Sequence, residues 1–224
     1  MGFSLPISRP LVRTGAERAT LVRRTYGLVL IGVLFTVGGV AFAFTQAALM
    51  ETVVRHPFLS FLAVIAPLWL AMRKPTAFPM NIGFVLLFTV IEGIWIAPFI
   101  AFYGAKDPSL VWQAGALTLS TFGVLTAYAW ISRRDFSAWG SFFVVGLWVL
   151  IGTSLLNLFF HSEAASLAIA GATVLVFSGL LIFDTWRIRN VFGPDDYVVA
   201  AVTIYLDLLN LFMAILRLLG GRRT

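Results

Sequence analysis

The chain has 224 residues, of which 60% are hydrophobic and only 12% are charged. A soluble domain of this length carries about 25% charged residues, so 16 basic and 10 acidic side chains are too few for a polar shell, and a soluble fold is excluded. The apolar stretches are continuous and do not alternate, which excludes a transmembrane β-barrel and predicts α-helices that cross a bilayer. The absence of cysteine excludes disulfides, thiolate metal sites and cysteine nucleophiles.

Stretches long enough to cross the membrane follow one another along the chain. About 20 apolar residues span the hydrocarbon core. We identify seven such stretches, at residues 26–48, 57–72, 78–102, 110–132, 139–160, 166–190 and 197–219. The second is short and contains Pro67, which predicts a kink or a tilt. We therefore expect an all-α integral membrane protein, a seven-helix bundle over residues 26–219 with a basic tail at 1–25 and a short basic tail at 220–224.

The basic residues predict an orientation in the membrane. Lys and Arg in short flanks favour the cytoplasmic side. Most of them fall on the side of the N-terminus: Arg9, Arg13, Arg18, Arg23, Arg24, Arg73, Lys74, Arg133, Arg134, Arg187 and Arg189. The other side receives Arg55, Lys106, Arg217, Arg222 and Arg223. We expect a cytoplasmic N-terminus, in a bacterial inner membrane, and the net charge of +6 indicates orientation and not nucleic-acid binding. The basic C-terminus leaves six full spans plus a re-entrant segment as an alternative.

Three carboxylates lie within the predicted spans, where charge is unfavourable. They are Glu92, Asp184 and Asp207. An acid at the membrane centre costs about 2.5–3.5 kcal/mol even on lenient insertion scales. Such residues mark an ion path, a proton relay or a structural polar contact. The alternative to a function is a carboxyl group hydrogen-bonded to a neighbouring helix. We expect Glu92 to face the interior of the bundle.

Asp184 and Asp207 lie at equal distances from the turn at residues 193–196. In an antiparallel hairpin such residues share one depth, here about 12–17 Å from the cytoplasmic helix ends at a rise of about 1.5 Å per residue. If both faces point inward, the two acids meet and share a proton. Such a pair is also a transient site for a hard cation such as calcium, which prefers oxygen ligands. Asn210, one turn beyond Asp207, could add an amide, but two acids are too few for a tightly bound ion, so we expect no resident cofactor.

Two arginines are candidate partners for these acids. Arg73 ends the second predicted helix and could reach inward as a counter-charge; the alternative is an ordinary flanking residue with a snorkelling side chain. Arg187 follows Asp184 by three residues, so a pair within one helix could compete for that acid.

At these residues the chain resembles a known family. Residues 204–212, Ile-Tyr-Leu-Asp-Leu-Leu-Asn-Leu-Phe, continuing to Leu-Arg-Leu-Leu-Gly at 216–220, resemble the C-terminal signature of the Bax inhibitor-1 family, also called transmembrane Bax inhibitor motif proteins. Residues 182–185, Ile-Phe-Asp-Thr, resemble the motif of its sixth helix, in which Tyr more usually precedes Asp. Weaker resemblances cover residues 88–93, 72–74 and 134–137.

The resemblance implies a fold and a function. It implies seven helices with the last one surrounded by the other six, and a pH-sensitive calcium leak in which Asp184 and Asp207 sense pH. It also implies that Arg73 helps to latch the closed state. From their positions within the spans, we expect Glu92 and Asn210 to be additional polar pore residues. The expected partners are the lipid bilayer, calcium ions and protons, with no nucleic acid and no defined protein partner.

Two other functions remain open. Eukaryotic members of the family are linked to suppression of cell death, so one alternative is a non-conducting membrane protein that binds a partner. Two intramembrane aspartates also describe presenilin-like aspartyl proteases, in which the pair activates water. The Gly-x-Gly-Asp pattern and a Pro-Ala-Leu motif are both absent, so we expect that the protein is not an enzyme.

Overall fold

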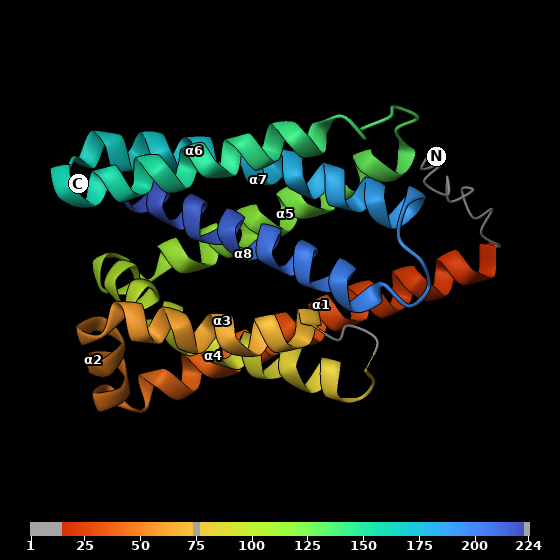
Figure 1. The fold of residues 1–224 in the computed structure, drawn as a ribbon. Coiled ribbons are helices and arrows are strands. Elements are labelled where there is room, and N and C mark those ends of the chain that lie inside the picture. The colour runs from red at the N-terminus through yellow and green to blue at the C-terminus, as the bar shows by residue number, and fades with distance from the viewer. Residues whose placement is uncertain (1–14, 74–76, 222–224) are drawn as a thin grey trace, which may run out of the picture.

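The computed structural model describes residues 15–73 and 77–221, and its regular elements are all α-helices (Figure 1). They are α1 (Gly15–Phe44), α2 (Ala47–Arg55), α3 (Pro57–Arg73), α4 (Met80–Lys106), α5 (Ser109–Ile131), α6 (Trp139–Phe160), α7 (Glu163–Asn190) and α8 (Tyr197–Gly221). Six of these helices, α1 and α4 to α8, are long and apolar enough to cross a membrane. Helices α2 and α3 meet at a bend of 101° and add a seventh span if the pair is counted as one. The expected all-α membrane bundle is confirmed, with six or seven spans.

Several boundaries differ from those expected. Helix α1 begins at Gly15, so residues 15–25, which we assigned to a tail, continue the first helix. Helix α2 was not expected, because Glu51 and Arg55 interrupt the apolar pattern there. An exposed ion pair between these two residues, one helical turn apart, is compatible with a helix. Five basic residues used to predict the orientation lie outside the described residues: Arg9, Arg13, Lys74, Arg222 and Arg223.

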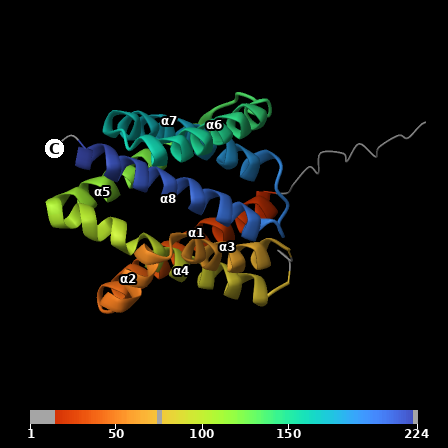
Figure 2. The same ribbon diagram turned by 60° about the vertical axis from the view of Figure 1, so that its left-hand side comes forward.

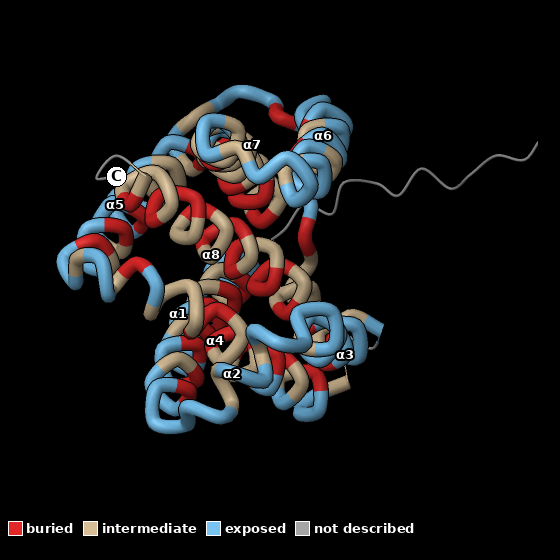
Figure 3. The backbone as a smooth tube through the Cα atoms, turned by 90° about the vertical axis from the view of Figure 1, so that its left-hand side faces the viewer, coloured by how far each residue is buried: buried red, intermediate tan, exposed pale blue. Residues whose placement is uncertain are grey.

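Helix α8 is central, as expected. It runs between α1–α4 on one side and α5–α7 on the other (Figures 2 and 3) and packs against α1, α4, α5 and α7. In its most apolar stretch 61% of the residues are buried, compared with 6% in α6. Helix α6 packs chiefly on α7, at the outside of the bundle. The other helices therefore do not surround α8 equally.

Helices α1 and α4 run side by side and approach each other at two glycines. A Cβ atom added to Gly39 would collide with the carbonyl oxygen of Val90, and one added to Gly93 would collide with the carbonyl oxygen of Thr36. Small residues at such positions let helix backbones meet closely in a membrane. A hydrogen bond of 2.7 Å between the hydroxyls of Thr36 and Tyr205 then fixes α8 to this pair of helices.

The alternating directions of the helices give the bundle two distinct ends. We call the end at which α1 and α8 begin and α3, α5 and α7 finish the arginine-rich end (Figure 1, right). The described arginines at this end are Arg18, Arg23, Arg24, Arg73, Arg133, Arg134, Arg187 and Arg189. Helix α2 and the last turn of α8 lie at the opposite end (Figure 1, left).

Candidate functional site

Asp184 of α7 and Asp207 of α8 come together inside the bundle. The two residues are only 5% and 4% exposed, and their carboxyl groups lie within interaction range of each other. At about 1.5 Å per residue, Asp184 lies roughly 9 Å from the end of α7 at Asn190, and Asp207 roughly 15 Å from the start of α8 at Tyr197. The two acids therefore lie close together, as expected, although Asp184 lies nearer its helix end than the expected distance of about 12–17 Å. Two carboxyl groups this close do not readily ionise together, and they tend to share one proton.

The second oxygen of Asp207, Oδ2, is buried and has no hydrogen-bond partner among the described residues. An unsatisfied buried carboxyl oxygen costs free energy, and a charged one costs much more than a neutral one. The surroundings of Asp207 therefore favour its neutral form.

Arg187 neutralises the other member of the pair. Its Nη1 donates a hydrogen bond of 2.8 Å to Oδ1 of Asp184. The guanidinium is held in place by aromatic rings, with its Cζ 4.4 Å from the ring centre of Phe192 and 5.7 Å from that of Phe183. The i,i+3 spacing within α7 was the sequence signal for this contact. Arg187 therefore stabilises the ionised form of Asp184.

Arg73 does not take the position expected of a latch. Its guanidinium stacks on Trp69, one turn earlier in α3, with 4.7 Å between Cζ and the ring centre. The residue is exposed, and within the described part of the chain the arginine that binds the pair is Arg187. A flat guanidinium at a helix end readily stacks on a neighbouring aromatic face. In this structure the guanidinium of Arg73 contacts Trp69 and not the two acids. The latch role of Arg73 therefore stays a prediction.

Glu92 and Asn210 occupy two other places beside α8. Glu92 is 7% exposed, so the prediction that it faces the interior is confirmed; it lies within electrostatic range of Tyr205, on the side of α8 that faces α1 and α4. The amide of Asn210 donates to the carbonyl oxygen of Leu206 on its own helix, at 2.8 Å. Asn210 also lines a cavity of about 1250 Å³ that extends to Lys106 and Arg217 at the end opposite the arginine-rich end.

A cluster of buried hydroxyls beside the pair was missed from the sequence. The hydroxyl of Tyr26 in α1 lies within interaction range of Thr126 in α5 and Thr185 in α7. None of these three hydroxyls has a partner at full hydrogen-bond geometry among the described residues. Thr185 is adjacent in the chain to Asp184, which was the only available signal. The cluster depends on which faces of three helices meet.

The site offers few ligands for a metal ion. Within residues 15–73 and 77–221, no group of three or more His, Cys, Asp or Glu side chains is placed to hold one. The pair itself supplies two carboxyl groups, and one of them is already bound to Arg187. Calcium takes six to eight oxygen ligands, so this arrangement suits brief occupancy by a partly hydrated ion.

The chain is similar to proteins of bacteria, fungi and animals. Residues 18–224 match the family model described as "Inhibitor of apoptosis-promoting Bax1". The chain is 34% identical over 209 residues to Bax inhibitor 1 of Schizosaccharomyces pombe, covering 91% of this chain and 77% of the relative. It is also 34% identical over 206 residues to protein lifeguard 4 of Mus musculus, with coverage of 90% and 85%. An uncharacterized membrane protein of Vibrio cholerae is 37% identical over 162 residues, with coverage of 71% and 72%.

Proposed function

Because this chain belongs to the Bax inhibitor-1 family of multi-pass membrane proteins, we propose that it is a pH-sensitive calcium leak channel gated by Asp184 and Asp207. We place it in a bacterial inner membrane with the arginine-rich end in the cytoplasm. The observation that carries the proposal is the close approach of two buried carboxyl groups, which do not readily ionise together and tend to share a proton. A relay or ion path is the usual reason for intramembrane acids.

Loss of that proton is the gating step. With the proton on Asp207, the charges of Asp184 and Arg187 cancel and the closed pair is neutral. Rising pH removes the proton and leaves two adjacent negative charges, which repel strongly because water screens them poorly at this depth. The pair relieves the repulsion when the helices separate, when water enters, or when a cation binds. Each of these changes favours an open or ion-occupied state.

Polar groups flank the pair on both sides and supply a route. The hydroxyls of Tyr26, Thr126 and Thr185 lie on the arginine-rich side and suit proton exchange with water. On the other side the large cavity extends to Asn210, one helical turn from Asp207. Lys106, Arg217 and Glu163 also line that cavity. The net positive charge of these three residues opposes the entry of a divalent cation, so the flux is that of a slow leak.

Calcium flux from purified protein in liposomes tests this function. We expect the wild-type flux to rise as the pH on the arginine-rich side is raised, and Asp207→Asn and Asp184→Asn to lose or strongly shift this dependence. The double variant should add little, because the two residues act as one unit. Asp135→Asn is the matched control, since Asp135 is exposed in the loop before α6, where it accepts a hydrogen bond from the backbone of Ser137. If both single variants kept the wild-type pH profile, the gating proposal would be wrong.

A non-conducting, partner-binding function is the second candidate. It is favoured by the name of the yeast relative, Bax inhibitor 1. The same liposome experiment separates the two candidates, because a partner-binding protein produces no calcium flux above that of empty liposomes at any pH. An intramembrane aspartyl protease is less well supported, since the named relatives are not named as enzymes.

A further inference from the structure

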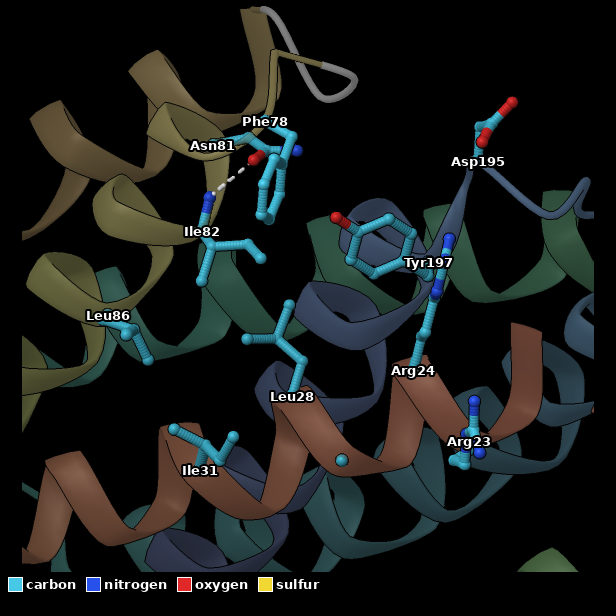
Figure 4. A pocket seen from close by; sticks show the side chains of 11 residues that line it. Arg23, Arg24, Leu28, Ile31, Phe78, Asn81, Ile82, Leu86, Asp195 and Tyr197 are labelled. Atoms are coloured by element: carbon cyan, nitrogen blue, oxygen red, sulfur yellow. Dashed lines mark hydrogen bonds between the residues drawn. The ribbon is translucent and has the colours of Figure 1, made fainter. Parts of the chain in front are cut away.

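A cleft at the arginine-rich end has no part in the mechanism above. It has a volume of about 600 Å³ and is lined by α1, by the start of α4 and by the turn between α7 and α8 (Figure 4). Its lining combines two arginines with an apolar floor. The residues are Arg23, Arg24, Gly27, Leu28, Ile31, Phe78, Asn81, Ile82, Leu86, Asp195 and Tyr197.

The arginines of the cleft are available to an anion. Arg23 and Arg24 are both exposed, and neither forms an ion pair with a carboxylate in the described part of the chain. Arg24 is positioned by Tyr197, with its Cζ 5.5 Å from the ring centre, and Figure 4 shows the two side chains next to each other at the mouth. Asp195 is the acidic residue of the lining, so the cleft has a net positive charge. Guanidinium groups bind phosphate through paired charge-assisted hydrogen bonds.

Three backbone N–H groups at the start of α4 already donate hydrogen bonds within the protein and are not available to such an anion. The backbone N–H of Asn81 donates to the carbonyl of Ala77, and that of Gly83 donates to the carbonyl of Pro79. The N–H of Ile82 donates to the side-chain oxygen of Asn81 at 2.8 Å (Figure 4). These donors are already used, so the two guanidinium groups are the anion-binding elements.

Below the arginines the cleft becomes apolar. Leu28 and Ile31 of α1 face Ile82 and Leu86 of α4 across it (Figure 4). Ile31 is 44% exposed although it lies within a membrane-spanning helix. The cleft therefore opens sideways toward lipid, and it suits a ligand with an anionic head and a hydrocarbon chain.

The arginines also lie at the depth of lipid headgroups. Residues 25–44 of α1 extend about 30 Å at about 1.5 Å per residue, which matches the hydrocarbon core. Arg23 and Arg24 come directly before this segment. Their guanidinium groups are thus placed where the phosphates of the adjacent leaflet lie.

We propose that this cleft binds an anionic glycerophospholipid from the leaflet at the arginine-rich end. Arg23 and Arg24 hold its phosphate, and one acyl chain lies along Leu28, Ile31 and Ile82. Tyr197 at the start of α8 contacts the headgroup beside Arg24. The binding depends on the shape and charge of the cleft and does not require that the protein conducts calcium.

Native mass spectrometry of the purified full chain tests the proposal with phosphatidylglycerol and phosphatidylcholine of identical acyl chains. We expect the wild-type protein to retain one phosphatidylglycerol in preference to phosphatidylcholine. The variant with Arg23→Gln and Arg24→Gln should lose affinity by at least about tenfold, as expected when charge-assisted hydrogen bonds to phosphate are removed. The matched control is Arg133→Gln with Arg134→Gln, which removes the same charge at the same end outside the cleft and should bind as the wild type does.

Two further measurements distinguish a lipid held in the cleft from a free anion bound to the arginines. Ile31→Trp fills the apolar part without changing any charge, and it should weaken phosphatidylglycerol binding. Inorganic phosphate should fail to displace the lipid. The proposal is overturned if both double variants lose binding equally, which would indicate general attraction to basic surface. It is also overturned if Ile31→Trp binds normally, or if phosphate competes as well as the lipid does, because the site would then recognise only a free anion.

Discussion

Replacement of Gly39 by Ala should separate two helices that the structure brings into backbone contact. The added Cβ atom would collide with the carbonyl oxygen of Val90 in α4. A backbone atom cannot rotate aside as the end of a flexible side chain can, so α1 has to move away from α4. Gly38 is the neighbouring position on the same helix, and a Cβ added there meets nothing within 4 Å. The two substitutions are chemically identical and differ only in the face of α1 that they change.

The expected magnitudes follow from this difference. Overpacking costs about 1–3 kcal/mol, and collision with backbone places Gly39→Ala near the upper part of that range. Replacement of glycine by alanine inside a helix returns about 0.5–1 kcal/mol. We therefore expect Gly39→Ala to lower the free energy of unfolding by about 1–2 kcal/mol and Gly38→Ala to leave it unchanged or raise it slightly. For a chain of this size the loss corresponds to a fall in Tm of roughly 2–8 °C.

Tryptophan fluorescence during heating in detergent provides the assay, since the chain has seven tryptophans. All variants must be heated at one rate, because membrane proteins often unfold irreversibly and Tm then depends on the scan rate. A Tm for Gly39→Ala equal to or above that of Gly38→Ala would refute the close α1–α4 contact. It would also remove the basis for placing Thr36 against Tyr205.

Three further predictions concern α8, the orientation and the Asp pair. Tyr205→Phe removes the hydrogen bond to Thr36 and should lower the free energy of unfolding by about 0.5–1.5 kcal/mol, measured as a fall in Tm; an unchanged Tm would mean that the bond contributes nothing. Arg134→Cys in this cysteine-free chain should react with a membrane-impermeant thiol reagent only from the cytoplasmic side, and labelling from outside would reverse the topology. Arg187→Gln removes the positive charge that favours ionised Asp184, so the liposome calcium flux should rise only at higher pH than in the wild type; a shift to lower pH would contradict the assigned role of Arg187.

The bundle and the meeting of the two acids were predictable because each follows from a distance along the sequence: the length of an apolar stretch and the separation of a residue from a turn. Bilayer thickness sets the length of an apolar helix, so the positions of the spans follow closely from the sequence. The approach of Asp184 and Asp207 follows from their similar separation in sequence from the turn between α7 and α8. Helical rise alone brings such residues to the same level.

The remaining features depend on which helix faces meet, and a single sequence does not contain that information. Helix α2 was missed because charged residues end an apolar stretch without ending a helix. Arg73 was considered as a partner for the acids, but its guanidinium reaches Trp69 on its own helix first. The clustering of Tyr26 with Thr185 requires the mutual rotation of α1 and α7. Hydropathy does not specify these rotations.

The placement of Asp207 on α8 indicates which part of the bundle we expect to move when the pair becomes charged, as the proposed function requires. Tyr205 and Asp207 are two residues apart, so at about 100° per residue they face nearly opposite sides of α8. Tyr205 is hydrogen-bonded to Thr36 of α1, and Asp207 lies beside Asp184 of α7. Repulsion between Asp207 and Asp184 pushes α8 toward α1 and α4. Those helices are already in backbone contact at Gly39 and Gly93 and cannot close further. Since interiors this closely packed deform little, we expect α8 to stay on α1 and α4 while α7 moves away together with α6, which packs on it. Under the proposed function, we expect the opening to form between α7 and α8, where the two carboxylates would face the entering ion.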